Sequence, residues 1–132
     1  MTVIEKLPIF KYIDVTRVTF KAKIFAEMLG FTPPQQYMIA TAVSELATNI
    51  IRYAGKGEIT LRKIENNDKI GVEIIAEDKG PGIEDIEKAI EDNFSTSKSL
   101  GLGLPGVKRL MDEFMVDSRR NVGTRIVSRK WV

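Results

Sequence analysis

The segment between residues 33 and 54 is the feature that most restricts how this chain can fold. It begins at Thr32-Pro33-Pro34, and prolines in a first helical turn lose only N–H donors that would be unpaired anyway. It ends at Gly55, and glycine commonly terminates helices. Apolar residues recur on one helical face: Val43, Leu46, Ile50 and Tyr53. The segment therefore predicts an amphipathic helix, the longest element of the chain.

Shorter elements are predicted on both sides of this helix. Residues 9–13 predict a first strand, and Asp14 is the predicted N-cap of a helix that ends at Gly30. That helix carries Val18, Phe25, Met28 and Leu29. After the long helix the pattern predicts, in chain order, a hairpin of residues 58–64 and 69–77 around Glu65-Asn66-Asn67-Asp68, a short helix at 83–91, a polar stretch at 93–99, a helix at 103–114, and a closing hairpin of residues 115–119 and 124–131.

The order of these elements predicts the fold class. Strands and helices do not alternate strictly, which disfavours a doubly wound parallel sheet. We predict an α+β protein instead, a two-layer α/β sandwich with a mixed, mostly antiparallel sheet and helices on one face. No internal repeat or long linker interrupts the chain, so residues 1–132 are predicted to form a single domain.

The composition excludes several kinds of chemistry and partner. Without histidine or cysteine the chain cannot build a Ser-His-Asp triad, a thiol nucleophile, a Cys/His zinc site or the His-Arg-Asp loop of eukaryotic-type protein kinases. The 20 basic and 18 acidic residues leave a net charge of +2, without the surplus expected of a nucleic-acid binder. No apolar stretch is long enough to span a bilayer, and the first residues lack a secretory signal pattern. We expect a cytoplasmic protein with no nucleic-acid or membrane partner.

The long helix carries a carboxylate and an amide on one face. Successive helical residues rotate by about 100°, so Glu45, Asn49 and Arg52 share a stripe beside the apolar one. Glutamate can take a proton from a hydroxyl, and an asparagine oxygen is a neutral ligand that Mg²⁺ accepts beside phosphates and water. The alternative interpretation is the plain solvated face of an amphipathic helix.

A second motif, Asp78-x-Gly80-x-Gly82, follows directly after a predicted strand. Its two glycines let the backbone turn sharply and approach a ligand. An aspartate held at a strand end can accept a hydrogen bond from an exocyclic amine such as that of adenine. An ordinary turn is the alternative, since Asp, Gly and Pro are all common in turns.

A third motif, Gly101-Leu102-Gly103-Leu104-Pro105-Gly106, opens a predicted helix. It matches G-x-G-x-x-G, but a dinucleotide fold requires a preceding apolar strand, and residues 93–97 are polar. A glycine-rich turn at a helix N-terminus favours an anion such as a triphosphate, and Lys98 would add a positive charge. A capped helix with flexible glycines is the alternative.

The order of the three motifs resembles the GHKL ATPase family. The family's N-box is similar to Glu45-x-x-x-Asn49, its G1 box to Asp78-x-Gly80-x-Gly82, and its G2 box and ATP lid to residues 95–104. Gly123-Thr124 resembles a family element in which a threonine on a late strand lies near adenine. The resemblance covers most of the chain and implies the Bergerat ATP-binding fold. Several segments look most like the RsbT-type switch kinases of the bacterial stressosome, which are anti-sigma-factor-type kinases: residues 44–47, 76–83, 94–97 and 103–114.

The resemblance implies a role for each matched residue. Glu45 would polarise the acceptor hydroxyl, Asn49 would hold Mg²⁺, and Asp78 would read adenine. Lys98 departs from relatives that carry an arginine in the lid, and lysine offers a point charge rather than a bidentate fork. The other positions implied to bind the nucleotide are Gly80, Gly82, Gly101, Leu102, Gly103, Leu104 and Thr124, together with Asn49 and Lys98.

The resemblance also implies a function. We expect an ATP- and Mg²⁺-dependent serine/threonine protein kinase that phosphorylates a STAS-domain partner, is released, and then activates a downstream PP2C-type phosphatase. One alternative is an anti-sigma factor kinase that binds a sigma factor and phosphorylates its antagonist. Another is a nucleotide-gated binding module without phosphoryl transfer. A generic α+β interaction domain without nucleotide would require three motifs to coincide in order.

Overall fold

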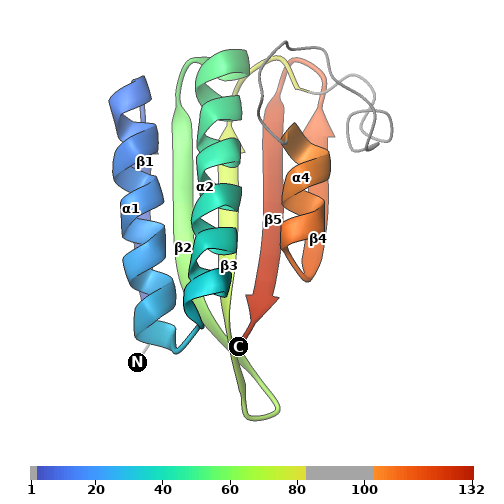
Figure 1. Cartoon of the computed structure of the whole chain (residues 1–132). Coiled ribbons are helices and arrows are strands. Elements are labelled where there is room, and N and C mark those ends of the chain that lie inside the picture. The colour runs from blue at the N-terminus through green and yellow to red at the C-terminus, as the bar shows by residue number, and fades with distance from the viewer. Residues whose placement is uncertain (1–2, 83–102) are drawn as a thin grey trace.

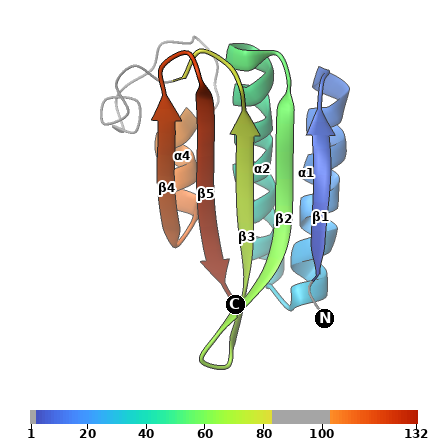
Figure 2. The same ribbon diagram turned by 180° about the vertical axis from the view of Figure 1, so that it is seen from behind.

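The fold, described in a computed structural model for residues 3–82 and 103–132, is a five-stranded sheet with helices on one face (Figures 1 and 2). The strands lie in the order β1-β2-β3-β5-β4, and each neighbouring pair is antiparallel. The predicted α+β two-layer sandwich is confirmed. The elements are β1 (Ile4–Ile9), α1 (Tyr12–Leu29), α2 (Pro33–Ala54), β2 (Gly57–Asn66), β3 (Lys69–Asp78), α4 (Gly103–Leu110), β4 (Glu113–Arg119) and β5 (Gly123–Trp131).

Part of the prediction lies outside the residues that the structure describes. This holds for the short helix predicted at residues 83–91 and for the polar stretch at 93–99. Within the described residues, no helix combines the length and the apolar character that a membrane span needs.

The core lies between α2 and the central strands. Residues that alternate along β2 and β3 point toward the helices and are fully buried: Ile59, Leu61, Val72 and Ile74. Residues of α2 that recur at the helical period meet them: Ile39, Val43, Leu46 and Ile50. Each such side chain contributes roughly 1.5–3 kcal/mol when it leaves water. This apolar layer fixes α2 against the sheet.

The helix α2 has the limits that its sequence predicts. The Thr32 amide donates to Gln35 Oε1 at 3.0 Å and the Gln35 amide donates back to Thr32 Oγ1 at 3.4 Å, which forms a capping box. Gly55 closes the helix with a positive φ of 83°. Tyr53, however, does not belong to the buried stripe, because 52% of it is exposed.

The N-terminal prediction was wrong in its boundaries. The first strand is Ile4–Ile9, and Ile13 lies in α1, where it is 59% exposed. Asp14 is not the N-cap but the third helical residue. Its carboxylate accepts from the amides of Phe10 and Lys11 at 2.9 and 3.0 Å, and these bonds hold its pKa below the ordinary value. The carboxylate thus reaches back over the first turn, and the helix begins at Tyr12, three residues earlier than an N-cap at Asp14 would place it.

The remainder of α1 agrees in part with its prediction. Val18 and Phe25 are buried and Gly30 ends the helix with a φ of 98°, as expected. Leu29 packs against the core from the side. Met28 is 73% exposed, because it projects from a different side of the helix than the buried Val18, Ala22 and Phe25.

The hairpin of β2 and β3 is tighter than predicted. Its strands pair as far as Asn66 and Lys69, so the turn consists of Asn67 and Asp68 alone. Both have positive φ angles, 51° and 70°, as the two-residue turns that match strand twist require. Asparagine and aspartate tolerate this conformation better than most residues. The hairpin is confirmed, with longer strands.

The helix predicted at residues 103–114 is too long by four residues. The helix α4 ends at Leu110, and Phe114 belongs to β4, where it pairs with Ser128. The Asp112 amide donates to the carbonyl of Arg129 at 2.9 Å, and the Trp131 amide donates to Asp112 Oδ2 at 2.8 Å. Pairing with β5 therefore takes over the chain at this point. The closing hairpin is confirmed.

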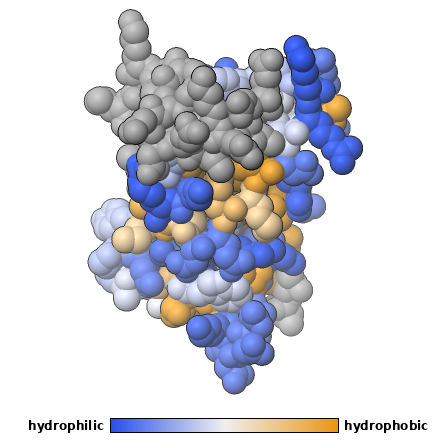
Figure 3. All heavy atoms as spheres, turned by 90° about the vertical axis from the view of Figure 1, so that its right-hand side faces the viewer, coloured by the Kyte–Doolittle hydropathy of each residue, from blue (hydrophilic) through white to orange (hydrophobic). Residues whose placement is uncertain are grey.

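The strand β4 forms one edge of the sheet, and Figure 3 shows this side of the molecule. Phe114 and Val116 point inward and pack against the core, while Met115 between them is 48% exposed. Apolar surface is visible there among polar side chains (Figure 3). Alternation of this kind is normal for an edge strand with one covered face.

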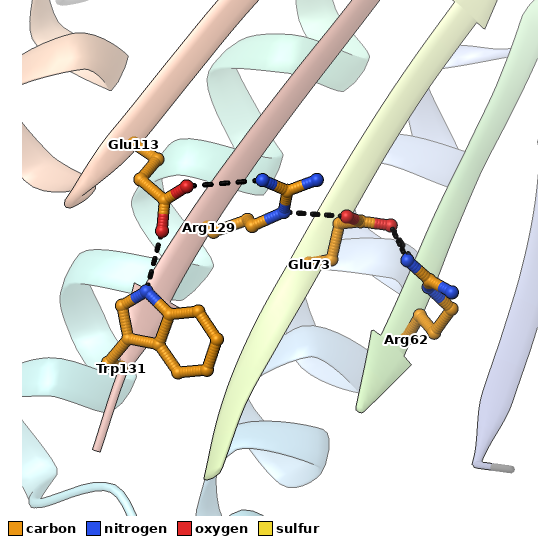
Figure 4. A network of polar contacts seen from close by, with 5 residues as sticks. All are labelled: Arg62, Glu73, Glu113, Arg129 and Trp131. Carbon is orange, nitrogen blue, oxygen red and sulfur yellow. Dashed lines mark hydrogen bonds and ion pairs between the residues drawn. The ribbon is translucent and has the colours of Figure 1, made fainter. Parts of the chain in front are cut away.

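The other face of the sheet carries a row of charged side chains across four strands (Figure 4). Glu73 at its centre is only 3% exposed. It accepts from Arg62 Nη2 at 2.7 Å and from Arg129 Nε at 2.7 Å. Glu113 then accepts from Arg129 Nη1 at 3.1 Å and from the Trp131 indole at 2.6 Å. The bond to Glu73 is the largest effect raising the pKa of Arg129.

Removing the central carboxylate should destabilise the protein. We expect Glu73→Ala to lower the free energy of unfolding by about 2 kcal/mol, because two guanidinium groups lose their acceptor. Urea denaturation measures this change. Glu77→Ala is the matched control on the same strand and face, since Glu77 is half exposed and 3.8 Å from Arg125. Its effect should stay within about 0.5 kcal/mol. Equal effects of the two substitutions would contradict the assigned role of Glu73.

Acid should weaken the same row. Hydrogen bonds from Trp131 and then Arg129 lower the pKa of Glu113. A carboxylate with a lowered folded-state pKa contributes stability above its unfolded pKa of about 4.3, and this stability is lost as the pH falls through the folded value. We expect Glu113→Gln to flatten the fall in unfolding free energy between about pH 5 and pH 2. Parallel curves for the variant and the wild type in urea titrations at several pH values would refute this.

Candidate active site

The carboxylate and the amide of α2 lie where the sequence places them. Glu45 and Asn49 are one helical turn apart and half-buried, on the flank of the stripe that carries Leu46 and Ile50. Arg52 continues the same stripe toward the end of the helix and is exposed. Burial of the apolar stripe therefore fixes the direction in which Glu45 and Asn49 project.

The helix α4 brings a distant segment to Glu45. The amide of Gly103, the first residue of α4, donates to Glu45 Oε2 at 3.2 Å across 58 residues of sequence. Leu104 and Val107 of α4 are buried in the core that also contains Leu46 and Ala47 of α2. A helix N-terminus carries unpaired amides and a partial positive charge. The Glu45 carboxylate is thus the anion that meets this end of α4.

A row of four paired residues crosses the sheet at the end of β3, near the C-terminal end of α2. Gly57, Asp78, Thr124 and Ser118 stand opposite one another on β2, β3, β5 and β4. Thr124 is 9% exposed, and its hydroxyl lies 2.9 Å from the hydroxyl of Ser118. Asp78 is half-buried, and its Oδ1 accepts from the Gly80 amide at 2.8 Å. The second carboxylate of the site is therefore held at the end of β3, by the amide of the turn that follows it.

Two glycines are required here because the chain passes very close to its neighbours. A Cβ at Gly80 would lie 2.6 Å from the Cβ of Ala54, near the end of α2. A Cβ at Gly123, whose φ is 147°, would overlap the carbonyl oxygen of Asp78. The turn after β3 and the start of β5 are therefore packed directly against each other and against α2.

The structure gathers some predicted site residues and does not describe others. Glu45 and Gly103 are in contact, and Asp78 and Thr124 are direct neighbours across β3 and β5. Leu104 is 8% exposed and belongs to the core, so its side chain serves packing. Gly82, with a φ of 82°, lies beside the carbonyl of Arg119. Lys98, Gly101 and Leu102 lie outside the described residues.

Sequence reasoning missed two members of the sheet row. Ser118 contacts Thr124, and Gly57 has no room for a side chain, because an added Cβ would overlap the carbonyl oxygen of Glu77 and lie 2.8 Å from Ile50 Cγ2. Both are found only from the strand register, which places them in line with Asp78. Neither belongs to a local motif that the sequence displays.

The donor groups of the site suit a metal only in combination with a ligand. Among the described residues, no group of three or more Asp, Glu, His or Cys side chains could hold a metal ion. The Asn49 amide oxygen and the Glu45 carboxylate lie on one face of α2, and Glu45 Oε2 accepts from the Gly103 amide. Such a sparse set fits Mg²⁺, which binds proteins through one or two oxygens and completes its shell with phosphates and water.

Comparison with known proteins places this site in a family. The family model described as histidine kinase-like ATPase domain matches residues 12–130, which include α2, the Asp78 turn and α4. The chain belongs to this family. Its ATP-binding domains are those of the GHKL type, so the resemblance seen in the sequence is confirmed.

Two curated relatives indicate the branch of the family. The chain is 56% identical over 119 residues to the serine/threonine-protein kinase RsbT of Bacillus subtilis, with 90% of each chain covered. It is 38% identical over 114 residues to an anti-sigma F factor of Caldanaerobacter subterraneus, covering 82% of this chain and 78% of the relative. The expected likeness to GHKL serine/threonine kinases is thus confirmed, and with it the assignment as an enzyme of that kind.

Solved structures agree on the fold. The mycobacterial sensor histidine kinase MprB superposes with a TM-score of 0.56 at 18% identity, over 98% of this chain and 97% of the other. The catalytic domain of histidine kinase ThkA gives 0.55 at 17% identity, over 96% and 95%. At these identities the likeness concerns the arrangement of helices and sheet, and it supports the ATP-binding fold.

The close passage at Gly123 gives a test of the site. We expect Gly123→Ala to weaken ATP binding by about tenfold or more, because the added Cβ pushes Asp78 out of its position. Gly30→Ala is the control, since Gly30 also has a positive φ but no atom within 4 Å of an added Cβ. It should cost about 1–2 kcal/mol of stability through backbone strain and leave ATP affinity unchanged. Calorimetric titration with ATP compares the two, and equal affinities would count against the site.

Proposed function

We propose that the chain is an ATP- and Mg²⁺-dependent serine/threonine protein kinase whose substrate is a STAS-domain protein. In this proposal it acts in the cytoplasm as a partner switch in bacterial stress signalling. After phosphorylating the STAS-domain partner it is released and activates a downstream PP2C-type phosphatase. The observation that carries the proposal is the contact of Glu45 with the first amide of α4, one turn from Asn49.

The proposed chemistry needs few side chains. Phosphoryl transfer depends chiefly on positioning and on neutralising charge, and little covalent chemistry falls to the protein. Glu45 would accept the proton of the attacking serine or threonine hydroxyl, because its carboxylate is the base nearest the N-terminus of α4 among the described residues. Asn49 would hold Mg²⁺ through its amide oxygen. When bound, the metal would neutralise charge on the phosphates.

The nucleotide would be held by the end of the sheet and by α4. Asp78 is proposed to accept from the exocyclic amine of adenine, with Thr124 beside it on β5. Gly80 and Gly82 allow the backbone to turn under the base. The Gly103 amide, and with it the proposed Gly101, Leu102, Leu104 and Lys98, would face the phosphates.

The Glu45 contact also suggests how the site prepares for transfer. In the structure the Gly103 amide donates a hydrogen bond to Glu45 Oε2. A phosphate oxygen is the stronger acceptor for a helix N-terminus, because it carries more charge than one carboxylate oxygen. When the nucleotide binds, this amide would donate to a phosphate oxygen instead. The Glu45 carboxylate could then accept from the incoming hydroxyl.

A second function is favoured by a specific observation. The anti-sigma F factor relative, at 38% identity, is named for an activity against a sigma factor. The alternative is therefore a kinase that also binds a sigma factor and phosphorylates its antagonist. The higher identity to RsbT, 56% over 90% of each chain, favours the switch kinase.

Glu45→Gln separates binding from transfer. Incubated with Mg-ATP and a purified STAS-domain protein, the wild type should add one phosphate to it, observed by mass spectrometry. The variant should lose about 100-fold or more of this rate, because glutamine cannot take the proton. It should still bind ATP, whereas Asp78→Asn should lose ATP affinity.

Glu27→Gln serves as a control, since Glu27 is an exposed glutamate of α1. It should behave as the wild type. Equal transfer by the wild type and Glu45→Gln would refute the proposed base. ATP binding without transfer to any STAS-domain or sigma-antagonist protein would indicate a non-catalytic nucleotide-gated module. Capture of a sigma factor would favour the second function.

A further inference from the structure

Lys130 is almost fully buried, on the side of β5 that faces the helices. It is 9% exposed, and its neighbours across the sheet on that face include the buried Val72. Lysine is rarely buried unless its charge has a partner. Its Nζ donates to the carbonyl of Leu110 at 2.9 Å and lies 3.8 Å from Asp112 Oδ1. Its charge therefore has two partners, the carbonyl of the last residue of α4 and the Asp112 carboxylate two residues later.

This end of α4 is attached firmly to the sheet. The Asp112 amide donates to the carbonyl of Arg129 and the Trp131 amide donates to the Asp112 carboxylate, at 2.9 and 2.8 Å. Lys130 adds the contact to the helix itself. The C-terminal carbonyls of a helix carry partial negative charge, which a buried ammonium group complements.

The opposite end of α4 lies in the candidate site. The helix has eight residues, which corresponds to a length on the order of 12 Å. Its first amide meets the Glu45 carboxylate at 3.2 Å. A negative group therefore stands at the positive end of the helix dipole and a positive group at the negative end. So short a helix transmits a shift at one end directly to the other.

We propose that Lys130 is a positioning residue for ATP: by holding the Leu110 carbonyl, it places the first amide of α4 where a nucleotide phosphate binds. This inference rests on the proposed function of the same site. Lys130 does not touch the nucleotide in this arrangement and takes no part in proton transfer. Its effect is to keep the phosphate-facing amide in place before ATP arrives, which reduces the cost of ordering the site on binding.

The alternative role for Lys130 is stability alone. A lysine that only closes a helix end would, when replaced, lower the melting temperature and leave the nucleotide affinity of the folded protein unchanged. A positioning residue predicts a change in affinity in fully folded protein. It also predicts that the maximal rate changes little, because Glu45 remains in place once ATP has saturated the site.

The test replaces Lys130 with methionine, which keeps the apolar stem and removes the charged donor. Binding of the non-hydrolysable analogue AMP-PNP with Mg²⁺ is measured by calorimetry at a temperature where the variant is folded by circular dichroism. We expect the dissociation constant to rise by about fivefold or more. We expect kcat for phosphorylation of the partner to stay within about twofold while KM for ATP rises. Lys130→Arg, which keeps the charge and the donors, should restore most of the affinity.

Lys63→Met is the matched control. Lys63 and Lys130 both pair with Val72, one from each side, so the two lysines stand in the same row across the sheet. The Nζ of Lys63 lies 3.2 Å from Glu65 Oε1 and not at α4. Its replacement should leave the affinity unchanged. Lys130→Gln is made in parallel in case the methionine variant does not fold. Unchanged affinity in the folded variants, or failure of both to fold, would overturn the positioning role. No binding by the wild type would instead refute the proposed function.

Discussion

The burial of one face of α2 against β2 and β3 is the interaction on which the rest of the structure depends. Val43, Leu46 and Ile50 are almost fully buried against strand residues that are equally buried. Because a helix has a fixed rotation per residue, burying this stripe also fixes where Glu45 and Asn49 point. The stability of the fold and the geometry of the site therefore come from the same contact.

Charge is handled differently on the two faces of the sheet. On the face away from the helices, Glu73 is buried by the arginines beside it, and the cost of removing its charge from water is offset by direct hydrogen bonds. On the helix face, Lys130 is buried against the end of α4. In both places a long basic side chain brings its charge to an acceptor, the arginines to Glu73 and Lys130 to the Leu110 carbonyl.

The site combines parts that are far apart in the chain and have little stability individually. Glu45 comes from α2, Asp78 from the end of β3, Gly103 from α4 and Thr124 from β5. Asp78 and Thr124 are placed by strand pairing, whereas Gly103 is placed by the packing of a short helix on α2. The position of Gly103 also depends on the contacts at the two ends of α4, with Glu45 at its first residue and with Lys130 at its last.

Elements with local sequence signals were predictable from the residues alone. Thr32, the two prolines and Gly55 fix the limits of α2 through their own backbone chemistry, and the order of the three motifs indicates the family. The limits at Asp14 and Phe114 were wrong, because a carboxylate reaching back to Phe10 and a strand pairing with β5 decided them. Glu73 and Lys130 show no local signal of burial. Their roles follow from strand register, which brings them to arginines and to a helix end that lie far away in the sequence.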